Sequence, residues 1–230
     1  MTRIKICGNT EPAGVERAVS LRVDLLGFIF TRSKRQVSIE QAKALIAQVP
    51  NNVGRVGVFI DEPTDQIARI VEACGLTAVQ IYREPTEADR ALGVLLLPAL
   101  RISSLPLARN SPFPLSVDDQ PGIPLPLQGE GQGGGDYLLL DTWVPDSVGG
   151  TGQSWDWEQA QSLVRRYPVI VSGGLNPDNV GRAIRQLHPW GVDVCSGVEQ
   201  SPGVKDLAKL EMFVRAVRRA DVNPAEVGNR

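Results

Sequence analysis

Short apolar runs alternate with longer amphipathic stretches along most of the chain. Eight of the apolar runs are strand-like, and they predict β-strands at Arg3 to Cys7, Leu25 to Phe30, Arg55 to Ile60, Ala78 to Tyr82, Val94 to Ile102, Tyr137 to Asp141, Pro168 to Ser172 and Val192 to Cys195. Between these runs, apolar residues recur at helical spacing. The predicted helices are Pro12 to Leu21, Ile39 to Val49, Thr64 to Cys74, Trp155 to Arg166, Asn176 to Leu187 and Val204 to Arg219.

Strands that alternate with helices are typical of α/β folds with a parallel sheet. Eight strands in a chain of 230 residues favour a single (β/α)8 barrel, the TIM barrel, with a doubly wound sheet as the alternative. We expect the barrel to span residues 1–220 and a polar tail to follow at 221–230. Ser38 and Gln41 have the spacing of a capping box, which predicts the start of the second helix.

Residues 103–135 interrupt the alternation where the fifth helix is expected. The segment is rich in proline, which removes helical hydrogen bonds, and it ends in glycines, each of which costs a helix about 1 kcal/mol. An irregular segment therefore replaces most of this helix. It is either a loosely packed insertion or a polyproline-like cover on the fifth and sixth strands. Both interpretations place it on the outer wall, away from the chemistry.

The composition narrows the possible partners. A net charge of −2 and a pI near 5.6 favour neither nucleic acid nor an acidic membrane surface. Because the sequence has no bilayer-spanning apolar run and no signal-peptide layout at its start, we expect a cytoplasmic protein. The three cysteines are far apart and there is one histidine, so we expect no structural disulfide and no metal site.

Cys7 and Asp141 stand where the first and sixth predicted strands end. In α/β folds of this kind, the carboxyl ends of the parallel strands carry the chemistry. A free cysteine is usually a small core residue, but Cys7 precedes a glycine at a strand end. A carboxylate that ends an apolar strand must be solvated or paired, because burying it alone is costly. We therefore interpret the two side chains as proton-transferring groups.

Glycine-rich loops follow the last three predicted strands. In such loops the backbone N–H groups can approach an anion, and in barrels the last two loops are the usual phosphate site. Each loop alone is also compatible with a simple tight turn, but the three together favour a phosphorylated ligand. The candidate phosphate-binding residues are Gly150, Thr151, Gly152, Gly173, Gly174, Ser196 and Gly197.

Characteristic motifs follow one another in order along nearly the whole chain. They include Lys5-Ile6-Cys7-Gly8-Asn9-Thr10, Leu140-Asp141-Thr142, Gly149-Gly150-Thr151-Gly152, Ser172-Gly173-Gly174-Leu175 and Val192-Asp193-Val194-Cys195-Ser196-Gly197-Val198-Glu199. Together these motifs resemble the phosphoribosylanthranilate isomerase family. The resemblance implies a cofactor-free Amadori rearrangement in tryptophan biosynthesis, with Asp141 as general acid and Cys7 as general base. It implies that Arg35 binds the anthranilate carboxylate and that Gln80 and Asp193 belong to the substrate site. The partner is then a phosphorylated small molecule, and we expect a monomer or a homodimer.

Two positions depart from the family pattern. Tyr82 stands where the family usually has histidine, so a proton relay at this position is in doubt. Cys195 stands where serine is common and, being small, is expected to be tolerated. Two alternative functions are the histidine-pathway isomerase that performs the same rearrangement on a related barrel, and a phosphate-binding barrel without catalysis. Cys7 argues against the first, and Cys7 with Asp141 argues against the second.

Overall fold

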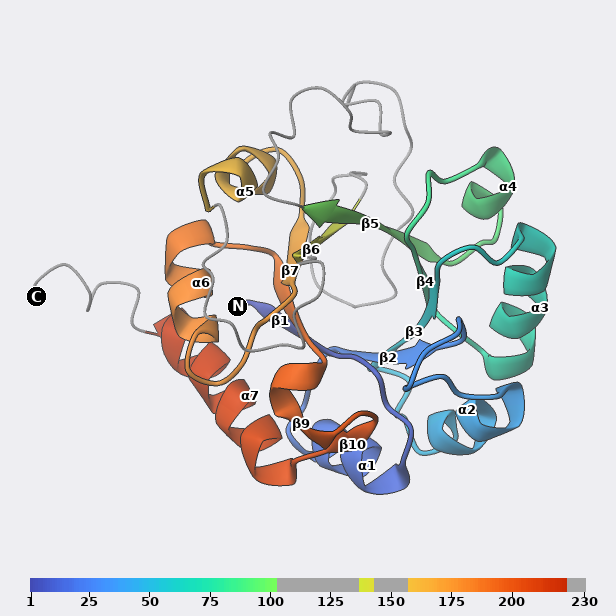
Figure 1. Cartoon of the computed structure of the whole chain (residues 1–230), viewed down its shortest axis with the longest axis horizontal. Helices are drawn as coiled ribbons and strands as arrows, with labels where there is room; N and C mark the ends of the chain where they lie inside the picture. The colour runs from blue at the N-terminus through green and yellow to red at the C-terminus, as the bar shows by residue number, and fades with distance from the viewer. Residues whose placement is uncertain (103–136, 143–156, 223–230) are drawn as a thin grey trace, which may run out of the picture.

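Eight parallel strands form a closed barrel, in which each strand pairs with the next and β8 pairs with β1. The computed structural model describes residues 1–102, 137–142 and 157–222. The strands, which surround the centre of Figure 1, are β1 (Arg3–Ile6), β2 (Leu25–Ile29), β3 (Gly54–Phe59), β4 (Ala78–Ile81), β5 (Leu95–Ile102), β6 (Leu138–Thr142), β7 (Val169–Ser172) and β8 (Gly191–Val194). The predicted (β/α)8 fold is confirmed, and the end of each predicted strand is within one residue of its observed position.

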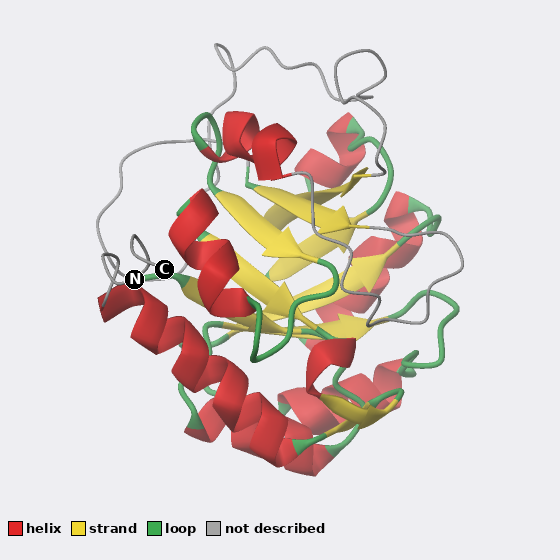
Figure 2. Cartoon of the chain, turned by 60° about the vertical axis from the view of Figure 1, so that its left-hand side comes forward, coloured by secondary structure: helices red, strands yellow, loops and turns green. Residues whose placement is uncertain are grey.

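Helices lie outside the strands and enclose the barrel (Figure 2). They are α1 (Pro12–Ser20), α2 (Ile39–Ile46), α3 (Thr64–Cys74), α4 (Glu87–Arg90), α5 (Trp157–Val164), α6 (Val180–Leu187) and α7 (Leu207–Val222). The helix predicted from Val204 begins later, because Val204 and Lys205 form β10, which pairs with β9 (Glu199–Ser201) in an antiparallel hairpin. This helix ends at Val222, two residues into the predicted tail. None of the described helices is long and apolar enough to cross a membrane.

The start of α2 has the predicted capping box. Ser38 Oγ accepts the Gln41 N–H at 3.2 Å, and Gln41 Oε1 accepts the Ser38 N–H at 3.0 Å. These two bonds satisfy donors that the first helical turn leaves unpaired. They fix where the loop after β2 ends, and this loop carries Arg35.

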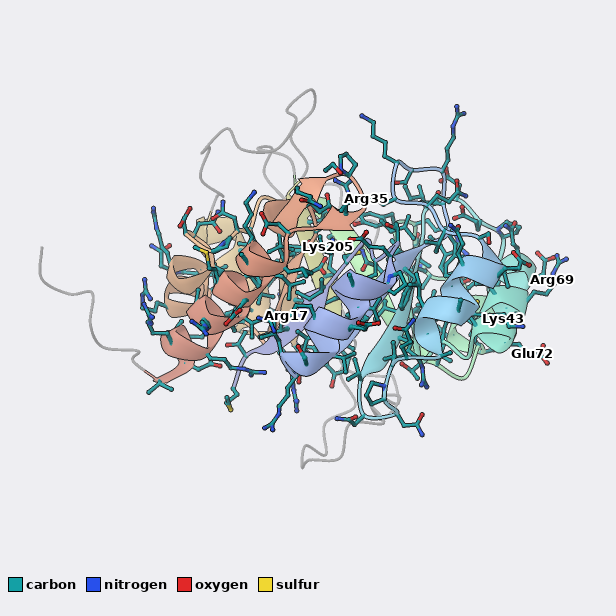
Figure 3. All side chains as sticks on the ribbon, turned by 90° about the horizontal axis from the view of Figure 1, so that it is seen from below. Arg17, Arg35, Lys43, Arg69, Glu72 and Lys205 are labelled. Carbon is teal, nitrogen blue, oxygen red and sulfur yellow. The ribbon has the colours of Figure 1, made fainter. Side chains whose placement is uncertain are left out.

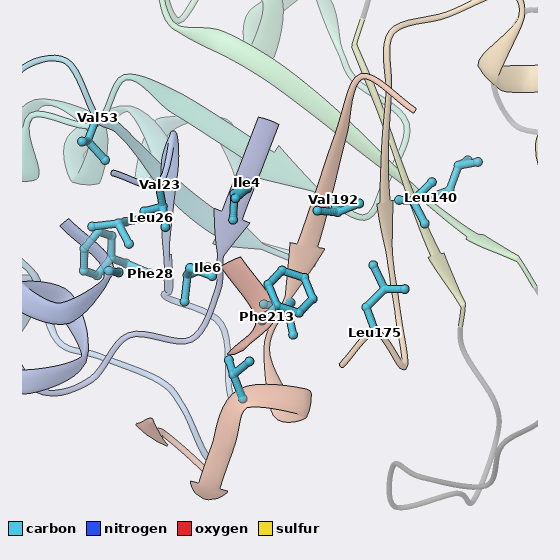
Figure 4. Packing of buried hydrophobic residues seen from close by; sticks show 14 of the residues in the cluster. Ile4, Ile6, Val23, Leu26, Phe28, Val53, Leu140, Leu175, Val192 and Phe213 are labelled. Atoms are coloured by element: carbon cyan, nitrogen blue, oxygen red, sulfur yellow. The ribbon is translucent and has the colours of Figure 1, made fainter. Parts of the chain in front are cut away.

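Outward-facing strand residues pack against the helices in the larger of two apolar layers. Figure 4 shows Ile4 and Ile6 of β1, Val192 of β8 and Phe213 of α7, all of which are fully buried. Burying a side chain of this size stabilises the fold by about 1.5–3 kcal/mol. This layer holds the helices on the barrel wall.

Inward-facing residues change character along the barrel. Near the starts of the strands they are apolar, and the cluster includes Leu139 and Ile170, against which Tyr137 and Trp190 pack. The two aromatic rings meet edge to face, with centroids 4.8 Å apart. Because inward positions recur every second residue, the next ones along β6 and β7 are Asp141 and Ser172. The amino end of the barrel is therefore filled with apolar groups and the carboxyl end with polar ones.

Several predictions fall outside the described residues. They concern the irregular segment at 103–135, the third glycine-rich loop at 149–152 and most of the polar tail.

Candidate active site

Cys7 directly follows β1, at the carboxyl end of the barrel. Its N–H donates to the Val194 carbonyl at 2.9 Å, which continues the ladder between β1 and β8. Because Ile6 pairs with Val194, Cys7 lies opposite Cys195, and the two side chains are hydrogen-bonded. Cys7 is buried. The structure thus brings two thiols together where the sequence pointed to one.

Gly27 on β2 leaves the space that the Cys7 thiol occupies. A methyl group at Gly27 would lie 2.8 Å from Cys7 Sγ and 3.2 Å from Lys5 Nζ. The first of these distances is far shorter than the roughly 3.5–4.0 Å of a favourable non-bonded contact. Any larger residue at this position would therefore displace the thiol.

A buried ion pair lies next to the two thiols. Lys5 Nζ donates to Asp193 Oδ1 at 3.0 Å, and the two side chains are 0% and 4% exposed. Ser172 Oγ donates to the other carboxylate oxygen of Asp193 at 2.9 Å. Burial is the largest single effect and disfavours the charged ammonium, but Asp193 and Cys7 together outweigh it and raise the pKa of Lys5 above its ordinary value. Lys5 is therefore a fixed positive charge inside the barrel, and Asp193 holds it in place.

The surroundings of Cys7 favour its thiolate form. The hydrogen bond from Cys195 is the main cause, and the positive charges of Lys5 and Lys205 add to it, while burial and Asp193 oppose it. The net result lowers the pKa of Cys7 to about 7. The same hydrogen bond, together with burial, raises the pKa of Cys195 well above its ordinary value. Around neutral pH, Cys7 is therefore the base of the pair and Cys195 keeps its proton.

A second ionic cluster is centred on Glu199, the first residue of β9. Arg35 donates from Nε to Glu199 Oε1 at 2.9 Å and from Nη2 to Oε2 at 2.7 Å, and Lys205 Nζ lies 3.1 Å from Oε1. Figure 3 labels Arg35 and Lys205 near the hairpin of β9 and β10. Lys205 is fully buried and also donates to the backbone carbonyls of Cys7 and Cys195. It therefore ties together the two chain segments that carry the thiols.

Only one edge of the Arg35 guanidinium is occupied by Glu199. The bonds come from Nε and Nη2, and within the described residues Nη1 makes no hydrogen bond. The side chain is 23% exposed. Because a guanidinium is a planar fork of N–H donors, its second edge can bind another carboxylate. The ion pair with Glu199 sets the orientation of that edge.

Asp141 on β6 is connected to β4 through Tyr82. The Tyr82 hydroxyl donates to Asp141 Oδ2 at 2.9 Å and accepts from Gln80 Nε2 at 3.0 Å. Burial raises the pKa of Tyr82 well above its ordinary value and Asp141 adds to the effect, so the tyrosine keeps its proton. Gln80 Oε1 is buried and has no hydrogen-bond partner among the described residues. Such acceptors are rare in folded proteins, so a ligand donor is the natural partner for this oxygen.

The two described phosphate-loop candidates pack against each other. Gly173 and Gly174 turn the chain after β7 with φ angles of 87° and 64°. Gly197 lies in the 3-10 turn that follows β8, and a methyl group there would lie 1.9 Å from the Leu175 carbonyl oxygen. The close contact therefore requires glycine at this position. It keeps the backbone of both loops together at the carboxyl end of the barrel.

The model of a known family, described as N-(5'phosphoribosyl)anthranilate (PRA) isomerase, matches residues 4–216. The chain belongs to the phosphoribosylanthranilate isomerase family. The N-(5'-phosphoribosyl)anthranilate isomerase of Desulforudis audaxviator is 37% identical over 224 residues, which cover 96% of this chain and 100% of the relative. The isomerase of Chlorobaculum tepidum is 37% identical over 231 residues, with 96% and 97% coverage.

Solved structures of phosphoribosylanthranilate isomerases have the same fold. The Thermotoga maritima enzyme matches with a TM-score of 0.76 and 30% identity, over 95% of this chain and 100% of that one. A structure in complex with reduced 1-(o-carboxyphenylamino)-1-deoxyribulose 5-phosphate matches with a TM-score of 0.74 and 30% identity, with the same coverage. Membership in this family confirms the predicted isomerase function in tryptophan biosynthesis and decides against both alternatives.

Glu199 and Lys205 are site residues that the sequence reasoning missed. Glu199 contacts Arg35 across 164 positions of the chain, and no local pattern marks such a contact. One signal was present: the opposite charges of Glu199 and Lys205, six residues apart, follow the eighth strand and its glycine-containing turn. The role of Cys195 was also missed, because it was expected only to be tolerated.

Proposed function

We propose that the chain converts N-(5'-phosphoribosyl)anthranilate to 1-(2-carboxyphenylamino)-1-deoxyribulose 5-phosphate, with Asp141 as general acid and Cys7 as general base. One observation carries this assignment. Cys7 directly follows β1, and Asp141 lies near the end of β6, so both residues lie at the carboxyl end of the barrel. The pKa of Cys7 is lowered to about 7. A base with a pKa near the working pH combines a useful fraction of the reactive form with enough basicity to remove a proton.

The acid step opens the ribose ring. Protonated Asp141 gives its proton to the ring oxygen, the bond between this oxygen and C1′ breaks, and the anthranilate nitrogen forms a C1′=N iminium. A protonated carboxyl group keeps one oxygen as an acceptor and carries the proton on the other. Because Oδ2 accepts the Tyr82 hydroxyl, we assign the proton to Oδ1.

The base step moves the double bond. The Cys7 thiolate takes the proton from C2′, the C–H electrons form a C1′=C2′ bond, and the iminium electrons return to nitrogen. The enolamine that results takes a proton at C1′ and loses one from its C2′ hydroxyl to give the ketone. Lys5 and Lys205 stabilise the thiolate before the transfer. No cofactor takes part in either step.

Substrate binding uses both sides of the barrel mouth. We assign the anthranilate carboxylate to the outer edge of Arg35, and a hydroxyl of the sugar to the unpaired Oε1 of Gln80. Asp193 acts through Lys5, which it holds. The phosphate is assigned to backbone and side-chain donors of the glycine-rich loops, namely Gly173, Gly174, Ser196 and Gly197, with Gly150, Thr151 and Gly152 outside the described residues.

We propose a monomer or a homodimer. A neighbouring structure, at 31% identity and a TM-score of 0.71, is described as monomers generated from the dimeric enzyme of Thermotoga maritima, so the fold is compatible with both states. A cytoplasmic location fits a biosynthetic isomerase with a phosphorylated small-molecule substrate. We assign neither nucleic acid nor membrane as a partner, in keeping with the net charge of −2.

The test is a fluorescence assay in which the labile substrate is made in place and loss of anthranilate fluorescence is followed. We expect wild type to exceed the spontaneous rate, and Cys7→Ala and Asp141→Asn each to lower kcat by at least about 100-fold, the usual size of general acid–base catalysis. Cys74→Ala, in α3, is the matched control and retains activity. Both inactive variants should still bind the reduced product analogue, reduced 1-(o-carboxyphenylamino)-1-deoxyribulose 5-phosphate. If wild type turns over no faster than the spontaneous rate, the isomerase assignment is refuted. If Cys7→Ala or Asp141→Asn keeps the wild-type kcat, the catalytic role of the replaced residue is refuted.

A further inference from the structure

We propose that Cys7 and Cys195 are a reversible oxidation site, at which a hydroperoxide joins the two sulfurs in an intramolecular disulfide and removes the catalytic base. The formation of the bond does not depend on the isomerase reaction. Only its effect on turnover rests on the proposed role of Cys7.

The register of β1 and β8 places the two residues within disulfide reach. Ile6 pairs with Val194, and the Cys7 N–H bonds to the Val194 carbonyl, so Cys7 and Cys195 are the next pair along two adjacent strands. Adjacent strands lie roughly 4.8 Å apart. Disulfides form at Cα separations of about 4.4–6.8 Å. The backbone therefore satisfies the main geometric condition without a rearrangement.

The Cys195 sulfur lies close to the backbone next to Cys7. A methyl group built on Gly8 would lie 2.8 Å from Cys195 Sγ, so this sulfur lies against the chain that leaves Cys7. Cys195 Sγ donates to Glu199 Oε1 at 3.7 Å, and its hydrogen bond to Cys7 is the main cause of the lowered pKa of Cys7. Cys74 is the only other cysteine, and it is buried in α3, where its sulfur lies 3.9 Å from the Ile39 carbonyl.

The chemistry follows from the different states of the two thiols. Cys7, as thiolate, attacks one oxygen of the hydroperoxide, which breaks the O–O bond and gives a Cys7 sulfenic acid and hydroxide or alkoxide. Cys195 then attacks the Cys7 sulfur, loses its proton and expels hydroxide, which forms the disulfide. With hydrogen peroxide the balance is two thiols and one peroxide to one disulfide and two waters. A thiolate beside a resolving cysteine is the usual arrangement at redox-sensitive sites.

Cys195 in this position protects the base from permanent damage. A sulfenic acid without a neighbouring thiol is oxidised further to sulfinic acid, which dithiothreitol does not reduce. Serine, which the resemblance suggests at this position, supplies a hydrogen bond but no sulfur. The Cys195→Ser variant is therefore the natural control, because it isolates the resolving thiol from the hydrogen bond.

The experiment uses a Cys74→Ala chain, so that Cys7 and Cys195 are the only thiols. The protein is treated with hydrogen peroxide, quenched with catalase and measured by intact mass and by turnover. We expect a mass lower by two hydrogen atoms, a cross-link between tryptic peptides 6–17 and 186–205, and recovery of the original mass with dithiothreitol. Turnover falls by at least about 100-fold, the contribution of a general base, and returns with the mass.

The same treatment of a chain that also carries Cys195→Ser gives the contrasting result. We expect added oxygen atoms in place of lost hydrogen atoms, and activity that dithiothreitol does not restore. Oxygen addition at Cys7 in the chain that retains Cys195, without the cross-link, would overturn the proposal. The intact mass and the cross-link are measured without substrate. A failure of the isomerase assignment would therefore leave both unchanged and would show only in the turnover assay.

Discussion

Replacing Cys195 by alanine tests how the barrel prepares its base. Cys195 supplies the hydrogen bond that is the main cause of the lowered pKa of Cys7. The other charged groups around Cys7 are unchanged in this variant: Lys5 and Lys205 still lower its pKa, and Asp193 still raises it. The substitution therefore removes one contribution and leaves the rest in place.

The size of the effect follows from the hydrogen bond. A hydrogen bond to a charged group contributes about 1.5–3 kcal/mol, and a thiol is a weak donor, so the lower end applies. About 1.4 kcal/mol corresponds to about one pKa unit. The pKa of Cys7 then rises by one unit from about 7. At pH 7 the thiolate fraction falls from about one half to about one tenth, and kcat/KM falls about fivefold.

The assay is the pH dependence of kcat/KM, which reports the ionisation of the free enzyme. In wild type we expect kcat/KM to rise with pH through about 7, as Cys7 loses its proton. In Cys195→Ala the rise is displaced to higher pH and the plateau at high pH is nearly unchanged. Cys195→Ser keeps an oxygen donor and stays close to wild type. If kcat/KM of Cys195→Ala rises over the same pH range as in wild type, the reasoning is refuted.

Two further substitutions test the packing around the site and the stability of the barrel. Gly27→Ala places a methyl group 2.8 Å from Cys7 Sγ, so kcat should fall by about 10- to 100-fold while binding of the reduced product analogue persists; an unchanged kcat contradicts the packing argument. Asp89→Asn disrupts a buried carboxylate that accepts hydrogen bonds from Arg83, Thr64 and Thr86, and we expect the free energy of unfolding at pH 7 to fall by about 3 kcal/mol. The folded-state pKa of Asp89 is depressed, mainly because the bonds from Arg83 and its neighbours outweigh burial. The contribution of Asp89 to the free energy of unfolding is therefore complete above the unfolded pKa of about 3.9 and is lost progressively as the pH falls below it. Urea titrations should show that the difference in the free energy of unfolding between wild type and Asp89→Asn shrinks from pH 7 to pH 3. A difference that is constant over this range contradicts the pKa assignment.

The sequence predicted the barrel well because its signal is local and repeated. Each strand run has its own boundary residues, and a parallel barrel needs no further information to bring Cys7 and Asp141 to the same end. The short elements were different. β9 and β10 hold three and two residues and α4 holds four, which is too few for a period to be visible.

The residues of the candidate site were likewise predicted only where the signal is local. The residues at strand ends were found, but the partners that set their properties were not. The contact between Arg35 and Glu199, and the fully buried Lys205, depend on how the hairpin after β8 folds back over the loop after β2. Cys195 illustrates the limit most clearly, since its size predicted tolerance while its pairing with Cys7 depends on the register of two strands distant in sequence.

The division of labour between Asp141 and Cys7 is the central claim, and deuterium at C2′ of the substrate tests it most directly. The measurement compares single-turnover rates with normal and deuterated substrate in Asp141→Asn and in Cys7→Ser. In Cys7→Ser the removal of the C2′ proton becomes the slow step, so deuterium should lower the rate. In Asp141→Asn ring opening becomes the slow step and precedes this removal, so deuterium should have no effect. An isotope effect in Asp141→Asn with none in Cys7→Ser would contradict the account.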